Sequence, residues 1–238
     1  MRAPKILVLV LHVDAGRYRQ MGDAQRRLWM EAGPLECIHY AGGGCGPPTL
    51  EHPHMLRIDA SEGNKWDVGP KTVAALAWAL DNRDFDFVFR TNSSSYVDQD
   101  RLITHAASLP REHCYSGRID PRYGDFASGS GYAISRDLVA ALVQSGCKLD
   151  DAPDDVALAR WLWLHTGVKP IDAPRIDLQL PRQLVEWRAA GRPANFHYRC
   201  RSLAIRRPFW ELSCFDEIRR SLEPGGHVPL GNFSQVIA

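Results

Sequence analysis

The sequence predicts a single-domain α/β protein in which a mixed β-sheet is covered by helices. Short apolar segments typical of buried strands alternate along the chain with amphipathic helical segments, as in such folds. The clearest strand, residues 85–89, runs directly into a cluster of small polar side chains. The chain has 238 residues, of which 45% are hydrophobic, and these values suit one globular domain.

Composition excludes several classes of protein. The net charge of +1 gives no overall attraction to nucleic acid or to a membrane. The first apolar run, Ile6–Leu11, is too short to span a bilayer and has no cleavage site, so we expect a cytoplasmic protein. The six cysteines lack the spacing of zinc ligands, and free thiols are predicted at Cys37, Cys45, Cys114, Cys147, Cys200 and Cys214.

The N-terminal third reads as strands separated by one helix. A first strand is predicted over residues 5–13, and a helix over 24–31 follows it. Residues 37–40 and 56–58 form two further short strands. The glycines at 42–44 resemble a phosphate-binding loop only weakly, because no Lys-Ser/Thr pair follows them, and we interpret them as a turn.

The central part contains the strongest helix and the strongest strand. Pro70 suits the first turn of a helix over residues 70–80, which has a continuous apolar face. The buried strand follows and ends in Arg90 and then in Thr91, Asn92, Ser93, Ser94 and Ser95. Ligands of open α/β sheets bind outside the carboxyl ends of strands, so this cluster predicts a site. An ordinary Asn/Ser turn is the alternative.

The next segments extend the alternation. A helix over 98–109 and a strand over 114–117 precede FASGSGYAISRD at 126–137, where Gly129 and Gly131 flank Ser130. Two glycines there would let backbone approach a ligand closely. Ser135 is predicted to cap a helix over 136–145.

The last third is less regular. Acidic residues at 150–155 precede an amphipathic helix over 156–165, and a loop-rich stretch follows from Val168. An extended segment, 195–201, and a weak helix over 215–222 complete the chain. Arginines are dense between 182 and 220, which indicates a partner bearing phosphate, carboxylate or anionic lipid, unless they form a solvated surface.

The order of these segments resembles the β-1,3-galactosyltransferase and Fringe family of glycosyltransferases. AQRRLW at 24–29 looks like the family's AIRxTW, and Lys71-Thr72 with Trp78 looks like its LTLKT…W helix. Residues 87–97 align with its strand ending in TDDDxxV. ASGSGYAISRDL at 127–138 is similar to CSGGGYVLSRDL, and PDDV at 153–156 is similar to (E/P)DDV. The resemblance implies a GT-A fold, with a Rossmann-like mixed sheet, and sugar transfer from a nucleotide-sugar donor.

One departure from the family concerns its metal. The family's acidic DxD motif binds Mn²⁺, which holds the diphosphate of the donor. The matching positions here, Asn92 to Ser95, contain no carboxylate, and hard divalent cations need anionic oxygen ligands. We therefore expect an enzyme that uses no divalent metal and no other cofactor.

The resemblance implies a role for the acidic pair before the helix at 156–165. Asp155 matches the residue that the inverting family uses as its general base, and Asp154 would be a cap or an orienting partner. Either residue could instead be only a cap of the helix. The choice between the two as base stays open.

Guanidinium groups are the predicted replacement for the metal. Arg199 and Arg201, with His197, lie where GT-A enzymes fold a tail over the donor, and guanidinium groups bind phosphate in a bidentate manner. An edge strand with its charged face in water is the alternative.

The full predicted donor-binding set comprises His12, Asp14, Arg26, Lys71, Thr91, Asn92, Ser93, Ser94, Ser95, His197, Arg199 and Arg201. The donor or acceptor sugar is expected at Gly129, Ser130 and Gly131. Trp66, Trp161 and Trp163 are candidates for stacking on a sugar, although the spacing of Trp161 favours the core.

The resulting prediction is an inverting, metal-independent glycosyltransferase that uses a nucleotide-sugar donor, with UDP-sugars favoured, and a glycan or glycolipid acceptor. Residues 1–180 form the catalytic core, and residues 181–238 form a basic segment of the same domain that folds back over the donor. No nucleic-acid partner is expected, and peripheral membrane association is left open, as is the oligomeric state. An inactive sugar-nucleotide-binding protein, an enzyme using CMP-sugars and a plain nucleotide-binding domain are the alternatives.

Overall fold

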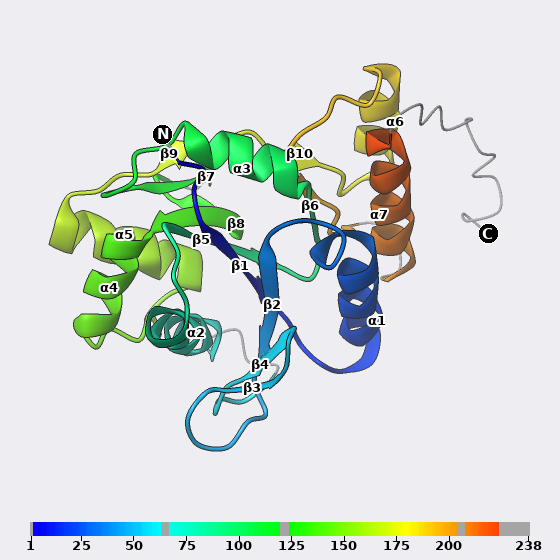
Figure 1. The fold of residues 1–238 in the computed structure, drawn as a ribbon. Coiled ribbons are helices and arrows are strands. Elements are labelled where there is room, and N and C mark those ends of the chain that lie inside the picture. Colours follow the sequence, from blue (N-terminus) through cyan, green and yellow to red (C-terminus); the bar gives the residue numbers. More distant parts are fainter. Residues whose placement is uncertain (1, 63–66, 120–123, 204–207, 224–238) are drawn as a thin grey trace.

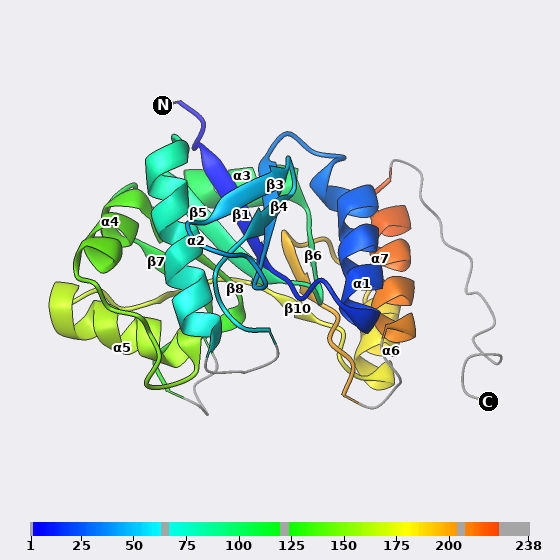
Figure 2. The ribbon, with the colours of Figure 1, turned by 90° about the horizontal axis from the view of Figure 1, so that it is seen from below.

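A computed structural model of the chain describes residues 2–62, 67–119, 124–203 and 208–223. The predicted mixed α/β architecture is confirmed, with helices on both faces of a central sheet (Figures 1 and 2). The strands of this eight-stranded sheet run in the order β3-β4-β2-β1-β5-β8-β7-β9. Their bounds are β1 (Ile6–Leu11), β2 (Glu36–Ala41), β3 (Thr49–His52), β4 (Met55–Arg57), β5 (Phe87–Asn92), β7 (Tyr115–Ile119), β8 (Ala127–Ser135) and β9 (Ile171–Asp172).

A smaller sheet and the helices complete the described fold. The three-stranded sheet has the order β10-β11-β6 and consists of β10 (Ile176–Asp177), β11 (His197–Arg199) and β6 (Ser95–Val97). The helices are α1 (Gly16–Gln25), the π-helix η1 (Arg26–Met30), α2 (Val68–Asn82), α3 (Gln99–Ala107), α4 (Arg136–Gln144), α5 (Asp154–Thr166), α6 (Pro181–Ala189) and α7 (Phe209–Leu222).

The central strands β1 and β5 are buried on both sides, which explains their nearly continuous apolar sequences. Alternate side chains of β5 enter two separate cores. Phe87 and Phe89 pack in the core that includes residues of α6 and α7, whereas Val88 packs in the core that includes residues of α2, α4 and α5. Arg90, two residues after Val88, therefore points to the same side as α2 and α5.

The direction of β8 determines where the site lies. β5 runs parallel to β1, and Leu11 lies opposite Asn92. β8 runs antiparallel to β5, and Thr91 lies opposite Gly131. The first residues of β8 therefore lie beside the last residues of β5, so FASGSG at 126–131 reaches the carboxyl edge of the parallel strands.

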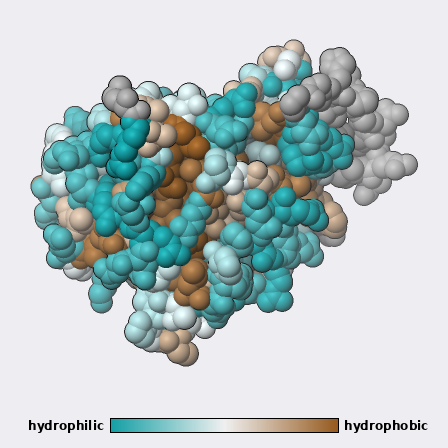
Figure 3. All heavy atoms as spheres, viewed as in Figure 1, coloured by the Kyte–Doolittle hydropathy of each residue, from teal (hydrophilic) through white to brown (hydrophobic). Residues whose placement is uncertain are grey.

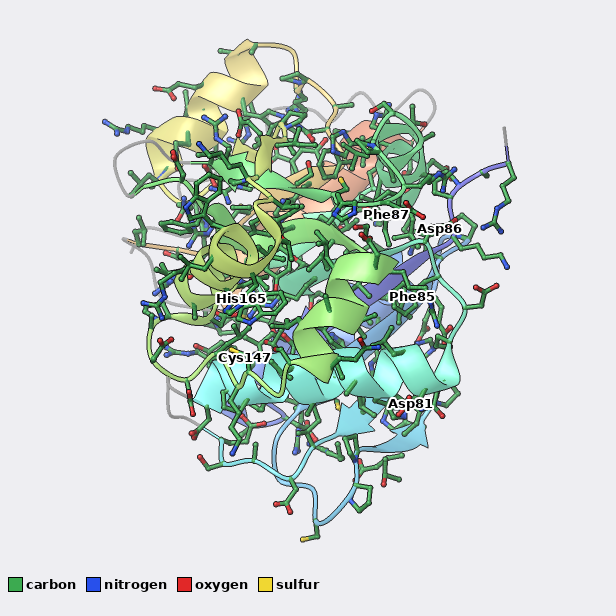
Figure 4. All side chains as sticks on the ribbon, turned by 90° about the vertical axis from the view of Figure 1, so that its left-hand side faces the viewer. Asp81, Phe85, Asp86, Phe87, Cys147 and His165 are labelled. Atoms are coloured by element: carbon green, nitrogen blue, oxygen red, sulfur yellow. The ribbon has the colours of Figure 1, made fainter. Side chains whose placement is uncertain are left out.

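Helices α2, α4 and α5 contact one another on one side of the sheet (Figure 4). In the same view, Asp86 lies at the start of β5, close to the N-terminal part of the chain. Its carboxylate accepts hydrogen bonds at 2.8 Å from the Lys5 amide and from Arg2. These bonds join the beginnings of the two central strands.

The structure differs from the predicted elements in several places. The first helix begins at Gly16 rather than near residue 24, and the loop-rich stretch after Val168 contains α6, whose buried face is only Leu184 and Trp187. Ser135 does not cap α4 with its side chain; its hydroxyl instead accepts a hydrogen bond from the Cys114 amide at 3.0 Å.

The glycines at 42–44 follow β2 with a bend at Gly42 and form no hydrogen-bonded turn of their own, unlike the prediction. The amides of Gly43 and Gly44 donate to the Ala60 and Ile58 carbonyls, and the Gly42 amide donates to Glu62. These three amides are therefore already occupied by the chain itself and form no phosphate cradle.

The surface and the thiols agree with a globular domain. Figure 3 shows mainly hydrophilic residues on one face, with a hydrophobic strip near its middle where β1 and β5 pass. Among the described residues, no helix has the length and apolar character needed to cross a bilayer. All six cysteines are free thiols, as predicted.

Candidate active site

A cavity of about 260 Å³ lies where β5 ends and where β8 and α5 begin. This position is the carboxyl edge of the parallel strands, where α/β proteins bind ligands. The cavity unites predicted residues from four distant parts of the sequence. It is lined by Leu11, Val68, Arg90, Asn92, Ser128, Gly129, Ser130, Pro153, Asp154, Asp155, Arg199 and Arg201.

Asp155 lies in the first turn of α5 with its carboxylate on the cavity. Its Oδ2 accepts a hydrogen bond of 2.7 Å from the Gly129 amide. A Cβ at Gly129 would lie only 3.0 Å from that Oδ2 atom and 3.2 Å from Nη1 of Arg90. Glycine at 129 lets the backbone of β8 and the carboxylate approach closely, and a larger residue would make these neighbouring side chains shift by a few tenths of an ångström. The N-terminus of α5 also stabilises negative charge at this place.

Asp154 is held by an ion pair with Arg90. Nη2 of Arg90 lies 2.6 Å from Oδ2 of Asp154, and only 2% of the Arg90 side chain is exposed. The same guanidinium donates to the Tyr40 hydroxyl at 3.0 Å and to the Gly129 carbonyl. Burial raises the pKa of Asp154 against the opposing effect of Arg90. Asp154 raises the pKa of Arg90 in turn, although burial opposes this.

Two arginines from the C-terminal part of the chain also line the cavity. Arg199, on β11, has a buried Nε atom without a hydrogen-bond partner, and its guanidinium forms no ion pair with any described residue. Burial and the nearby charge of Arg175 lower the pKa of Arg199 to about 10, so the group remains charged at neutral pH. Arg201 is exposed at the edge. An anion bound here would meet cations with free donors.

Arg175 lies near Arg199. Its Nη1 donates to the Ser130 hydroxyl at 2.5 Å, and its Nε lies 3.0 Å from Oδ1 of Asp177. Ser130 also contacts Ser128 through their hydroxyls at 3.0 Å. Ser130 is therefore fixed between Arg175 and the cavity.

The polar cluster after β5 mostly bonds to the chain itself. Thr91 and Ser95 donate to the Ser130 carbonyl at 2.6 and 3.1 Å. Ser93 donates to the Leu11 carbonyl at 3.1 Å, and the Ser94 amide and hydroxyl donate to Oδ1 of Asn92. Of these residues, Asn92 alone lines the described cavity.

The side chains of this cluster do not suit the Mn²⁺ that the β-1,3-galactosyltransferase and Fringe family binds. The amide oxygen of Asn92 already accepts two hydrogen bonds, and the three serine side chains are buried. In the described parts of the chain, no group of three or more His, Cys, Asp or Glu side chains is arranged to hold a metal ion.

Four further predicted donor-binding residues, all before β5 in the sequence, also lie outside the cavity lining and contact protein groups. His12 is buried, with its Nδ1 atom 3.0 Å from the Ser93 hydroxyl. Asp14 pairs with Arg19 and Arg57, and Arg26 pairs with Asp23. The Lys71 ammonium is buried and lies 3.1 Å from Glu62.

His197 and Gly131 pack against each other beneath the site. Nε2 of His197 lies 3.2 Å from the Ser95 hydroxyl. A Cβ at Gly131 would lie 2.3 Å from the His197 ring, so this glycine leaves room for the imidazole rather than for a ligand. Among the tryptophans, Trp66 lies outside the described residues, Trp161 is buried in the core, and Trp163 is exposed.

The sequence interpretation did not assign a role to Arg90, Tyr40 or Arg175. The sequence did contain a signal for Arg90. A charged residue that directly follows a buried apolar run needs a buried partner of opposite charge. The sequence around Arg175 carries no such signal, since its neighbours at Ser130 and Asp177 are brought together only by the folded chain.

Comparisons with known proteins address the fold and the ancestry. No protein-family model matches the chain. The UDP-GalNAc:beta-1,3-N-acetylgalactosaminyltransferase 2 of Danio rerio is 27% identical over 135 residues, and the match covers 48% of this chain and 27% of that protein's length. The chain is a distant relative of the Fringe-like glycosyltransferases. This similarity supports the prediction that the protein is an enzyme of the glycosyltransferase class.

Two solved structures have the same fold. A glycosyltransferase involved in the glycosylation of the major capsid of PBCV-1 gives a TM-score of 0.56 at 9% identity and covers 90% of this chain and 99% of its own. The apo-form glycosyltransferase GlyE of Streptococcus pneumoniae gives a TM-score of 0.50 at 11% identity. The match covers 94% of this chain and 61% of that structure's chain. The predicted GT-A fold is confirmed by this likeness.

Proposed function

We propose that the protein is an inverting, metal-independent glycosyltransferase. It transfers a sugar from a nucleotide-sugar donor, with UDP-sugars favoured, to a hydroxyl of a glycan or glycolipid. The observation that carries the proposal is that Asp155, Arg199 and Arg201 line one cavity. A base and a set of cations are the two groups that such a transfer needs.

The roles follow from the contacts. Asp155 takes the proton of the acceptor hydroxyl, whose oxygen attacks the anomeric carbon of the donor sugar. The bond from that carbon to the phosphate oxygen breaks, and the nucleotide diphosphate leaves with the electron pair. Arg199 and Arg201 stabilise the charge that develops on the diphosphate. Asp154 is committed to Arg90, so Asp155 is the better candidate for the base.

The C-terminal segment belongs to the same domain in this proposal. β11 pairs with β6, Arg199 lies opposite Ser95, and the side chains of α6 and α7 enter the core shared with β1 and β5. This arrangement supports the idea that residues after 181 cover the donor. Location in the cytoplasm and peripheral association with a membrane stay predictions.

A second candidate is a sugar-nucleotide-binding protein without catalysis. The amide of Asn92, in the place of a metal-binding acid, favours it. A donor with a single phosphate, such as a CMP-sugar, is a related option, because it has no diphosphate for a metal to bridge.

The test is a panel of UDP-, GDP-, CMP- and dTDP-sugars, with thermal stabilisation and release of the sugar as the two measurements. We expect one UDP-sugar to stabilise the protein and to be hydrolysed or transferred. Asp155→Asn should lower the rate by about 10²- to 10⁴-fold, because it removes a general base, while donor stabilisation persists.

Asp151→Asn is the matched control, since Asp151 is an exposed acid that lies just before α5 and pairs with Arg160 of that helix. Near-normal turnover by Asp155→Asn would rule out its role as base. Stabilisation without any sugar release by the wild-type protein would favour the inactive binding protein.

A further inference from the structure

A second cavity, of about 410 Å³, lies along α5 beyond the proposed active site. Its wall includes Phe126, Val156, Ala159, Trp163 and Lys169. The two cavities are neighbours along the chain in two places. Val156 follows Asp155 directly, and Phe126 precedes Ser128 by two residues.

One row of α5 side chains connects the two cavities. Asp155, Ala159 and Trp163 are spaced by four residues, so they lie one above another on the same face of the helix. Eight residues of an α-helix rise by about 12 Å. The distance from the proposed base to the indole is therefore longer than a single sugar ring.

Trp163 has the exposure expected of a ligand-binding aromatic residue. Its exposed fraction is 51%, whereas Trp161 and Leu162 of the same helix are buried. Cavities that bind small molecules combine apolar and aromatic walls with a few polar groups. Lys169 provides such a group: its Nζ lies over the Trp163 ring in a cation–π contact, 4.6 Å from the ring centroid, and forms no ion pair with a described residue.

We propose that this second cavity is an acceptor subsite that binds a sugar ring beyond the one that reacts. The proposal rests on the proposed function, because it takes the reacting hydroxyl to lie at Asp155. The apolar face of a pyranose then packs on the Trp163 indole, and Lys169 donates to a ring hydroxyl. The preferred acceptor is an oligosaccharide, since a single sugar cannot reach both Asp155 and Trp163.

The test is a glycan array that compares binding to immobilised mono-, di- and trisaccharides. These end in β-linked galactose, N-acetylglucosamine or N-acetylgalactosamine. The wild-type chain should bind the longer members of one series best. Trp163→Ala should weaken that binding by roughly 2- to 12-fold, the range of an aromatic contact, and should reduce the preference for length. Trp163→Phe should recover part of the loss.

Leu164→Ala is the matched control, because Leu164 is 68% exposed on the same helix and does not line the cavity. It should bind like the wild type, and thermal unfolding should show that all variants are folded. Unchanged binding by Trp163→Ala, an equal loss in Leu164→Ala, or no binding of any glycan by the wild type would each overturn the proposal. Absence of donor hydrolysis would contradict only the proposed function, since the glycan measurement needs no donor.

Discussion

At the scale of single residues, Arg90 holds the candidate site together. Its guanidinium binds Asp154, the Tyr40 hydroxyl and the Gly129 carbonyl from a position inside the central sheet. It thereby fixes both the start of α5 and the start of β8. Asp155 and the Gly129 amide meet because these two segments are anchored to the same side chain.

Loss of Arg90 should destabilise the fold. Arg90→Leu leaves the Asp154 carboxylate buried without its cation, which typically costs about 3–5 kcal/mol. Urea denaturation should show this decrease in the free energy of unfolding. The double variant Arg90→Leu/Asp154→Leu should recover part of the lost stability. Arg83→Leu, which removes a partly exposed pair with Glu36, should cost less than about 1 kcal/mol. Equal effects of the two single variants would contradict the assigned role.

Loss of Arg199 should weaken binding of the phosphate group. Arg199→Ala removes a cation whose buried donor has no protein partner, so affinity for UDP should fall by about 1.5–3 kcal/mol. Affinity for uridine should change little, and Arg199→Lys should restore binding only in part because it lacks the planar fork. Titration calorimetry would measure these values. Arg182→Ala, an exposed arginine on α6, is the control, and unchanged UDP affinity in Arg199→Ala would return Arg199 to a surface role.

At the scale of elements, the turn between β5 and β6 positions neighbouring strands through the hydrogen bonds of its side chains. Its hydroxyls fasten β5, β8 and the end of β1 to one another. The family resemblance identified the turn, because the strand before it and the motifs after it keep their order. What the turn contacts depended on neighbours that are distant in sequence.

Chelation should therefore leave donor binding intact. EDTA should not reduce the thermal stabilisation by the best UDP-sugar, and Mn²⁺ should not increase it, because neutral amide and hydroxyl groups bind such a cation weakly. Adding Mn²⁺ after EDTA treatment serves as the control. Stabilisation that disappears with EDTA and returns with Mn²⁺ would show that the residues bind metal after all.

At the scale of the whole molecule, three buried imidazoles pack around the central sheet. Burial lowers the pKa of His12 to about 4 and lowers the pKa of His39 and His197 well below the ordinary value. Each of these groups binds a proton more readily in the unfolded chain than in the folded protein. Their contribution to stability is therefore complete above pH 6.5 and is lost as the pH falls below that value.

Stability should fall between pH 7.5 and pH 5. Each unit of pH between the unfolded and the folded pKa costs about 1.4 kcal/mol per histidine. His12, whose pKa is about 4, therefore contributes about 2 kcal/mol of loss at pH 5, and His39 and His197 add to this loss. Denaturant titrations at several pH values would measure the slope. His197→Gln should lower stability at pH 7.5 but flatten this slope. A pH-independent free energy of unfolding would contradict the expectation.

The sequence was most informative where local pattern and final environment agree. The continuous apolar runs of β1 and β5 and the periodic face of α2 require burial wherever they lie, so they were predictable. Helix α6 was missed because two buried residues give almost no periodic signal. The pairing of β11 with β6, which carries Arg199 to the cavity, is a contact between residues about a hundred positions apart, and no local pattern encodes it.

That pairing has a consequence for the order in which the site is completed during synthesis. The acidic residue at position 155 leaves the ribosome before the cations at 199 and 201. A nascent chain that ends before β11 already possesses the strands and the start of α5, yet it carries no guanidinium from β11 to meet a diphosphate. In the proposed function, affinity for the donor therefore arises late, as the short strand β11 adds to β6.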